Sequence, residues 1–148
     1  MLDGLFVTPA VTAITEALAS AGAEGKLVVV GNAKLAAALK TKHDVTAVGL
    51  TPRAAKKLGD TLADTTTLAA GSVAAVICVD VTEDDAWQLA LREWSRIVRD
   101  GGAIVLVDRG QADEASRRAL CAGLTEIEQR HAGRAVVTSG LVSHLELG

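Results

Sequence analysis

The stretch Val73–Arg109, which reads VAAVICVDVTEDDAWQLALREWSRIVRDGGAIVLVDR, decides the fold of this chain. Its first part, Val73–Val81, is almost continuously apolar and rich in β-branched residues, as is typical of a strand that is buried on both faces. Its last part, Ala103–Val107, has the same character and follows a glycine pair, Gly101-Gly102. The two ends of the stretch therefore predict two strands of a parallel sheet.

The segment between these two strands has the period of a helix. Its large apolar residues recur every three or four positions, at Trp87, Leu91, Trp94 and Val98. Acidic residues precede the segment and two arginines close it, as the helix dipole favours. A helix that joins two parallel strands forms a βαβ unit, and the glycine pair is expected to break that helix before the second strand.

The rest of the chain adds the other elements of an open α/β sheet. The patterns predict strands at Lys26–Gly31, Val45–Leu50 and Arg134–Leu141, and helices at Ala33–Lys40, Arg53–Leu58 and Gln111–Ala122. Thr8-Pro9 is expected to open a further helix, because proline suits the first helical position. Leu124–Arg130 is expected to pair with the last strand as an antiparallel hairpin. Gly59–Ser72 has no β-branched apolar run, so a third strand is expected to be absent or vestigial.

Composition and charge bound the class of protein. At 148 residues, 49% of them hydrophobic, one domain is expected. The formal net charge of −3 argues against a general binder of nucleic acid or of anionic membranes, because such proteins present a basic face. No uncharged apolar run of 18 residues occurs, so no membrane span is expected and a cytoplasmic location is the default. No cysteine–histidine spacing typical of a metal site occurs either.

With these elements in view, the chain resembles class I S-adenosylmethionine (SAM) dependent methyltransferases. In that family a strand VVCxDVLEH, a helix LLREAxRVLRPGG and a strand RLVLVD follow one another. Here Val76–Glu83, Leu91–Gly102 and Ile104–Asp108 match them in turn. Val45–Pro52 is similar to the family's VTGVDLSP, and Gly31 falls near the first glycine of its VLDxGCGxG loop.

The resemblance implies a three-layer, Rossmann-like α/β domain that spans residues 1–148. Its sheet is mostly parallel, in the strand order 3-2-1-4-5-7-6 without most of strand 3, and closes with a C-terminal antiparallel hairpin. In such sheets ligands bind outside the carboxyl ends of the strands, where the strand order reverses. The resemblance therefore assigns the candidate cofactor-binding residues to one crevice: Gly31-Asn32, Gly49-Leu50 and Asp80-Val81.

Several groups that grip SAM in the family are missing from this crevice. The first loop keeps one glycine of the usual three, and Gly49 replaces the acid that accepts hydrogen bonds from the ribose hydroxyls. Each lost hydrogen bond to an ionised acceptor costs about 1.5–3 kcal/mol. Asp80 either holds the methionine amino group or a substrate, or caps the following helix. Asn32 either lines a remnant pocket or caps the Ala33 helix, and capping is the expectation.

Two main functions follow. The first is a methyltransferase-like domain that has lost SAM binding and catalysis and acts as a regulatory module that binds a protein partner or a second copy. Loss of the third strand would leave strand two as an unpaired sheet edge, and exposed edges are paired or covered, so a homodimer or docked partner is expected there. The alternative is a small SAM-dependent methyltransferase with an atypical cofactor site. No catalytic residue is assigned, and no cofactor is expected unless SAM binds.

A third and weaker hypothesis is a nucleotide-binding regulator that uses the Gly31-Asn32 turn to hold an anion. The sequence there, GNAKLA, matches no phosphate-binding fingerprint. The three hypotheses differ in which ligand stabilises the protein. SAM, NAD and ATP would each raise the melting temperature only if the native state binds them.

Overall fold

The computed structural model describes residues 2–59, 61–83 and 85–144. The strands are β1 (Leu27–Val30), β2 (Val45–Val48), β3 (Thr61–Leu62), β4 (Val73–Val79), β5 (Val98–Asp108), β6 (Thr125–Ala132) and β7 (Ala135–Leu141). The helices are α1 (Leu2–Ala21), α2 (Ala33–Lys40), α3 (Pro52–Leu58), α4 (Trp87–Ile97) and α5 (Ala112–Cys121). One turn of 3₁₀ helix, η1 (Val81–Glu83), follows β4.

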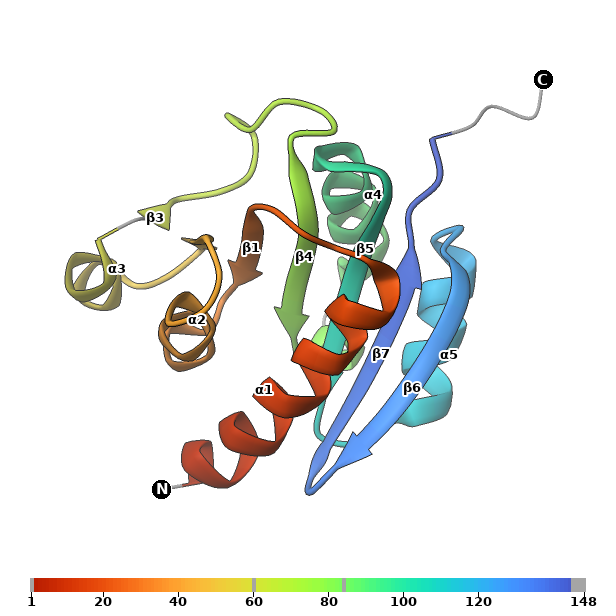
Figure 1. The fold of residues 1–148 in the computed structure, drawn as a ribbon, viewed down its shortest axis with the longest axis horizontal. Coiled ribbons are helices and arrows are strands. Elements are labelled where there is room, and N and C mark those ends of the chain that lie inside the picture. Colours follow the sequence, from red (N-terminus) through yellow and green to blue (C-terminus); the bar gives the residue numbers. More distant parts are fainter. Residues whose placement is uncertain (1, 60, 84, 145–148) are drawn as a thin grey trace.

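The strands form one sheet in the order β3-β2-β1-β4-β5-β7-β6 (Figure 1). The first five strands in that order are parallel to one another, whereas β7 is antiparallel to both β5 and β6. The strand order reverses between β1 and β4, which are hydrogen-bonded neighbours. The predicted order and the C-terminal hairpin are thereby confirmed.

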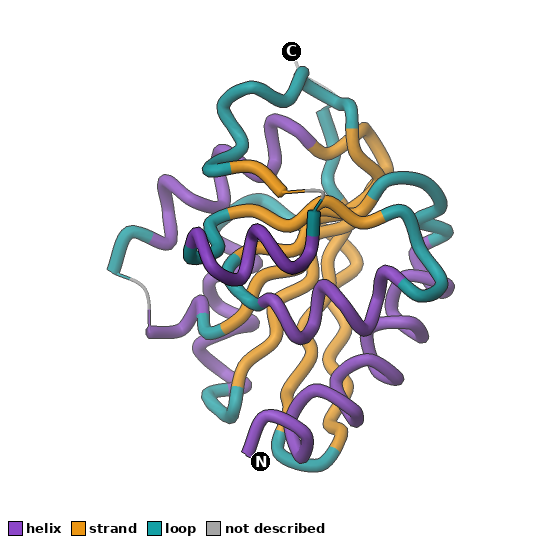
Figure 2. The backbone as a smooth tube through the Cα atoms, turned by 90° about the vertical axis from the view of Figure 1, so that its left-hand side faces the viewer, coloured by secondary structure: helices purple, strands orange, loops and turns teal. Residues whose placement is uncertain are grey.

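Helices cover both faces of this sheet, which makes three layers (Figure 2). Alternation along the strands separates two cores, because successive side chains of a strand point to opposite faces. Val29 and Ile77 face α1 and α2, and Val28 and Val76 face α4 and α5. No helix in the described part of the chain combines the length and the apolar character that a membrane span requires.

The βαβ unit forms as predicted, except where its second strand begins. The large buried side chains of α4 are Trp87, Leu91, Trp94 and Ile97. However, β5 starts at Val98, ahead of the glycine pair, and its register against β4 shifts before Ala103. A Cβ on Gly102 would lie 2.5 Å from the Ala74 carbonyl oxygen. Gly102 therefore permits a close approach of the β5 backbone to β4, and the helix has already ended before the glycine pair.

The third strand is vestigial, as predicted. It consists of Thr61 and Leu62, which pair in parallel with Ala47 and Val48 of β2. The Gly49 N–H donates to the Leu62 carbonyl at 3.1 Å and extends this pairing. The expected open edge at strand two is therefore corrected in part, because β3 pairs with the second half of β2.

Helix α1 begins earlier than predicted. The helix runs from Leu2, so Pro9 lies inside it and Thr8 does not cap it. A proline removes only one backbone donor, and the helix beyond it is fixed by buried residues such as Ala10 and Ile14, which are 0% exposed. Its end is as expected, because Gly22 takes a left-handed conformation (φ 65°) that terminates the helix.

Candidate functional site

The candidate crevice lies at the carboxyl ends of β1, β2 and β4. Val30 of β1 aligns with Cys78 of β4, so the segments Gly31-Asn32 and Val79-Asp80 leave the sheet side by side. The Gly31 N–H donates to the Val48 carbonyl at 2.9 Å, which ties the β1–α2 turn to the end of β2. The predicted dipeptides after β1, β2 and β4 thus meet at one edge of the sheet, where the strand order reverses.

The two glycines of this crevice have the same conformation and the same surroundings. Gly31 (φ 76°) and Gly49 (φ 72°) are both left-handed, a conformation that costs other residues free energy. A Cβ built on either would meet no heavy atom within 4 Å. Open space therefore lies beside both turns, and a ligand can approach their backbones closely. Leu50 instead packs in part against the core beneath α2.

Asn32 acts as the N-cap of α2, as expected. Its Oδ1 accepts a hydrogen bond from the Leu35 N–H at 2.9 Å. Thr51 caps α3 in the same way, with its Oγ1 3.3 Å from the Ala54 nitrogen. Both helices that flank the crevice therefore start immediately beside it, with their first turns held by side chains.

Asp80 does not cap the following helix, which corrects that expectation. It has a left-handed backbone (φ 60°), and its N–H donates to the Val107 carbonyl at 2.9 Å. Helix α4 has no side-chain cap. The Asp80 side chain is half-buried and forms no hydrogen bond or ion pair with the residues that the structure describes. An unusual backbone conformation thus holds a carboxylate at this end of the sheet, and the described residues give it no hydrogen-bond or ion-pair partner.

Val81, the last predicted site residue, points away from the crevice. Its side chain is 1% exposed and packs in the core under α4 and α5. Only its backbone takes part in the local polar network, where its carbonyl accepts a hydrogen bond from Arg118 Nη1. A ligand in the crevice would therefore meet Asp80 but not the Val81 side chain.

The carboxylate that holds the β4–α4 connection is Asp108, which sequence reasoning missed, and not Asp80, which was expected to cap the helix. Asp108 ends β5 and is 1% exposed. Its Oδ1 accepts hydrogen bonds from the Thr82 N–H at 3.2 Å and the Thr82 hydroxyl at 2.9 Å. Its Oδ2 is buried without a hydrogen-bond partner in the described part of the chain. The sequence did carry a signal, since β4 and β5 both lead from an apolar run into an aspartate.

Burial raises the pKa of Asp108 above its ordinary value. The two hydrogen bonds from Thr82 act in the opposite direction, the negative charge of Asp80 raises the pKa further, and Arg118 lowers it. Asp80 and Asp108 are therefore close enough to influence one another electrostatically. The pair places one half-buried and one fully buried carboxyl group at the ends of neighbouring strands.

Arg118 of α5 holds the same connection from the other side. Its Nε lies 2.6 Å from Glu114 Oε2, its Nη1 donates to the Val81 carbonyl, and its guanidinium lies 5.0 Å from the Trp87 ring centre. Hydrogen bonds from Arg117 and then Arg118 lower the pKa of Glu114 to about 2. Asp108 and Arg118 together fix the segment that begins at Asp80.

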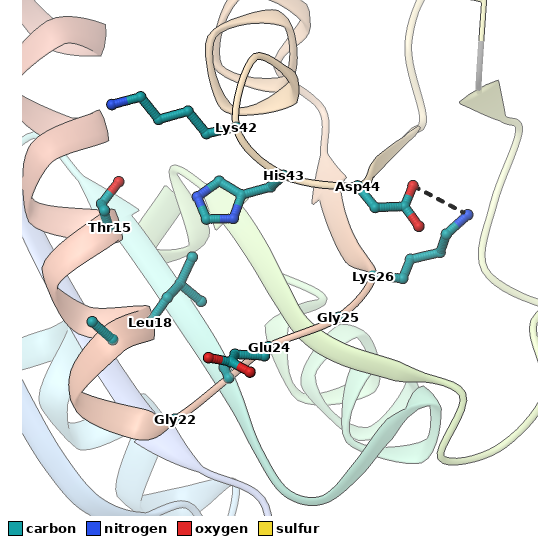
Figure 3. Close-up of a pocket in the computed structure, with 11 residues that line it drawn as sticks. Thr15, Leu18, Gly22, Glu24, Gly25, Lys26, Lys42, His43 and Asp44 are labelled. Atoms are coloured by element: carbon teal, nitrogen blue, oxygen red, sulfur yellow. Dashed lines mark ion pairs between the residues drawn. The ribbon is translucent and has the colours of Figure 1, made fainter.

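A separate hollow lies at the opposite edge of the sheet, before β1 and β2 (Figure 3). It has a volume of about 570 Å³ and lies between the end of α1 and the α2–β2 loop. In Figure 3 the His43 ring reaches toward α1, whereas Lys26 turns to Asp44, with which it forms an ion pair at 3.9 Å. The hollow has both signs of charge and includes none of the predicted site residues.

The sequence and the fold were compared with those of known proteins. No family model and no curated protein matches the sequence. Among solved structures, a putative methyltransferase from Haloferax volcanii, in complex with the Trm112 methyltransferase activator, matches at TM-score 0.73 and 15% identity, over 91% of this chain and 90% of that chain. A SAM-dependent methyltransferase from Aquifex aeolicus matches at TM-score 0.70 and 13% identity, over 95% of this chain and 92% of that chain. Geranyl diphosphate methyltransferase in complex with SAM matches at TM-score 0.65 and 14% identity, over 89% of this chain and 85% of that chain.

This chain has the class I SAM-dependent methyltransferase fold. The likeness extends along most of the chain, so the vestigial β3 and the short loops are variations within that fold. In open α/β sheets ligands bind where the strand order reverses, and Gly31, Gly49 and Asp80 lie at that point. The described residues contain no cluster of three metal-ligating side chains.

Proposed function

We propose that this protein is a small SAM-dependent methyltransferase with an atypical cofactor site. The observation that carries the proposal is the meeting of three turns at the carboxyl ends of β1, β2 and β4. Two open left-handed glycine turns, at Gly31 and Gly49, lie beside a carboxylate, Asp80, that has no partner among the described residues. A strained backbone position that presents an unpaired acid is a feature more often kept for ligand binding than for stability. The shared fold and the relative with bound SAM add support.

Each part of the crevice would contact a different part of SAM. The open turn at Gly31-Asn32 would receive the methionine moiety, and the Asp80 carboxylate would accept hydrogen bonds from its ammonium group. The ribose would lie near Gly49-Leu50. There the Gly49 N–H is already donated to the Leu62 carbonyl, and glycine itself has no carboxylate to accept from the hydroxyls. When bound, SAM supplies an electrophilic methyl group to a nucleophilic substrate.

Weak cofactor binding follows from this arrangement. Two hydrogen bonds to an ionised acceptor, at about 1.5–3 kcal/mol each, would be missing at Gly49. Their combined loss, about 3–6 kcal/mol, corresponds to a binding constant about 10²- to 10⁴-fold lower. We therefore expect dissociation constants for SAM well above those of a site that retains the ribose acid. No side chain of the crevice is assigned a catalytic role, because the substrate's nucleophile is unidentified.

Isothermal titration with SAM and with its demethylated product, S-adenosylhomocysteine (SAH), tests the proposal. We expect saturable one-to-one binding of both, and weaker binding of SAM to the Asp80→Asn variant because the amide cannot balance the ammonium charge. The Gly49→Asp variant is expected to bind more tightly, since it restores an acceptor for the ribose. Asp113→Asn, on α5, serves as the control. Absence of binding to the unmodified protein at millimolar SAM would reject the proposal.

A second candidate function is a methyltransferase-like module that binds no cofactor and acts through a protein partner. Gly49, in the place of the ribose acid, favours it. A relative of the same fold was solved in complex with an activator protein, which supports partner binding by this fold. This module would be cytoplasmic and would act either as a homodimer or through a different protein. Sedimentation equilibrium distinguishes the two, because finding only monomer at high protein concentration would exclude the homodimer.

A further inference from the structure

The charges of this protein are unevenly distributed along the chain. The segment Asn32–Gly59, which includes α2 and α3, carries six lysines and arginines against a single acid, Asp44. The remaining residues carry nine lysines and arginines against 17 acids. An acidic protein therefore has one strongly basic region, and asymmetry of this kind indicates an anionic partner.

Three cations of the basic region line an apolar groove between α2 and α3. The groove has a volume of about 450 Å³. Its lining combines four apolar residues with three cations and a threonine: Ala33, Ala37, Ala54 and Leu58, then Lys34, Arg53 and Lys57, and Thr51. No acid lines it. Arg53 and Lys57 form no ion pair with any residue that the structure describes, so their charges are not neutralised within that part of the chain.

Helix α3 is weakly held by the rest of the protein. It has seven residues, and none of them is buried. Isolated helices of this length are unstable in water, so packing has to hold them. The packing here comes from Leu58, which lies partly against the core, and from Lys40 of α2, whose Nζ donates to the Leu58 carbonyl at 3.3 Å. The apolar side of α3 is thus left half-covered, facing the groove.

We propose that this groove, here called the α2–α3 groove, binds an acidic amphipathic helix of a partner protein. The partner's apolar side chains would enter between Ala37, Ala54 and Leu58, as one helix packs on two others. Its carboxylates would meet Lys34, Arg53 and Lys57 at the rim, which is the complement of the charge found there. The groove starts at Ala33 and Thr51, so the partner would lie beside the crevice.

The lining favours a protein helix over a nucleic acid. Proteins that bind single strands stack bases on aromatic side chains. The α2–α3 groove has no aromatic residue, and the chain has only Phe6, Trp87 and Trp94. Alanine and leucine side chains suit aliphatic partners instead. This inference stands apart from the cofactor proposal, because a partner can occupy the groove whether or not SAM binds.

Titration of the ¹⁵N-labelled protein with a designed peptide tests the inference. The peptide has 16 residues of alanine, leucine and glutamate, with leucines at i, i+4, i+7 and i+11 and glutamates beside them. We expect shifts of backbone amide signals from α2 and α3, and weaker binding at higher salt because exposed charges are screened. A peptide of the same composition in scrambled order is the control for non-specific attraction.

Charge-reversal variants locate the site. Arg53→Glu combined with Lys57→Glu should weaken peptide binding about tenfold, because attraction becomes repulsion at two exposed positions. Ala37→Glu, on α2, should weaken it as well, and it remains informative if the first variant unfolds α3. The matched control, Arg92→Glu combined with Arg134→Glu, reverses two exposed cations elsewhere and should leave the affinity unchanged.

Four results would overturn the inference. One is equal affinity of the groove and control variants, and another is equal affinity for the ordered and the scrambled peptide. The third is tighter binding of a single-stranded RNA 16-mer than of the peptide, with shifts at α2 and α3, which would assign the groove to nucleic acid. The fourth is a dimer that the Arg53→Glu and Lys57→Glu changes dissociate, which would assign it to a second copy.

Discussion

Two aspartates at the ends of neighbouring strands have opposite surroundings. Asp108 is 1% exposed, and Thr82 satisfies one of its oxygens, while Oδ2 has no hydrogen-bond partner in the described part of the chain. Asp80 is half-buried, and its carboxylate has no partner among the described residues. Because burial raises the pKa of Asp108, its charged form is less favourable in the native state than in the unfolded state. Asp108 therefore affects stability, and Asp80 is expected to affect ligand binding.

The Asp108→Asn variant should change how stability depends on pH. A raised native pKa means that the native state keeps a proton that the unfolded state releases above pH ~4, so wild-type stability falls as the pH rises through this window. Asparagine has no such proton and still offers an oxygen to Thr82. Relative to wild type, the variant should gain stability between pH 4 and pH 7, by about 1.4 kcal/mol for each unit of the pKa shift.

Urea unfolding of both proteins at pH 4, 5.5 and 7 measures this effect. Asp44→Asn, at an aspartate whose side chain is 66% exposed, provides the control. Parallel stability profiles of wild type and the Asp108→Asn variant would show that the buried carboxyl does not titrate in this range.

Asp80→Gly should separate stability from binding. Glycine adopts the left-handed conformation at no cost, whereas aspartate at φ 60° stores about 1 kcal/mol. We expect the variant to be as stable as wild type or up to about 1 kcal/mol more stable, and to bind SAH more weakly. Urea unfolding and calorimetric titration give the two quantities. A loss of stability with unchanged SAH affinity would make Asp80 a structural residue.

At the scale of elements, α5 positions the β4–α4 connection through Arg118. The arginine joins Glu114 of its own helix to the Val81 carbonyl and the Trp87 ring. This contact links α5, η1 and the start of α4, which has no side-chain cap of its own. The orientation of the turn that carries Asp80 therefore depends on a helix that is distant in the sequence.

Glu114→Gln should destabilise the protein at neutral pH, and by less at pH 3 than at pH 7. The pKa of Glu114 is lowered to about 2, so its ionised form contributes stability above pH ~4.5 that is lost as the pH falls toward 2. Melting temperatures at pH 7 and pH 3 compare the two conditions. Glu24→Gln, at an exposed glutamate, is the control. A difference between wild type and the Glu114→Gln variant that is equal at both pH values would contradict the expectation.

The close approach of β5 to β4 at Gly102 leads to a second prediction at the scale of elements. A Cβ at Gly102 would lie 2.5 Å from the Ala74 carbonyl oxygen and from Val98 Cγ1, whereas one at Gly140 would lie 2.7 Å from Leu124 Cβ, a side-chain atom. Backbone yields less readily than side chains, so Gly102→Ala should cost about 3 kcal/mol and Gly140→Ala about 1–2 kcal/mol. Urea unfolding ranks the two, and the reverse order would refute the close backbone approach at Gly102.

Local pattern predicted the elements that bury apolar residues. Continuous apolar runs identified β1, β2 and β4, and Asn32 and Thr51 marked the starts of α2 and α3. The errors involve partners that are distant in the sequence. The start of β5 depends on its alignment with β4, and Asp108 holds Thr82 across 26 residues. A single sequence contains no direct record of such pairs, so capping was assigned to the nearer acid.

At the scale of the whole molecule, the described residues form the seven-stranded fold with a vestigial β3. The sheet keeps the strand order and the reversal between β1 and β4. Resemblance predicted this architecture because the scaffold residues, such as those of β4 and α4, follow the family pattern. From the missing ribose acid at Gly49 we predicted loss of SAM binding, whereas the unpartnered Asp80 among the described residues supports the alternative that SAM binds.

A crystal structure of the protein grown with SAH tests the central claim most directly. We predict density for one SAH molecule per chain at the carboxyl ends of β1 and β4, with its amino group on Asp80 and its ribose beside Gly49. The Asp80→Asn crystal grown at the same SAH concentration serves as the comparison and should show lower occupancy. An empty crevice at saturating SAH, or SAH bound at another place, would contradict the account.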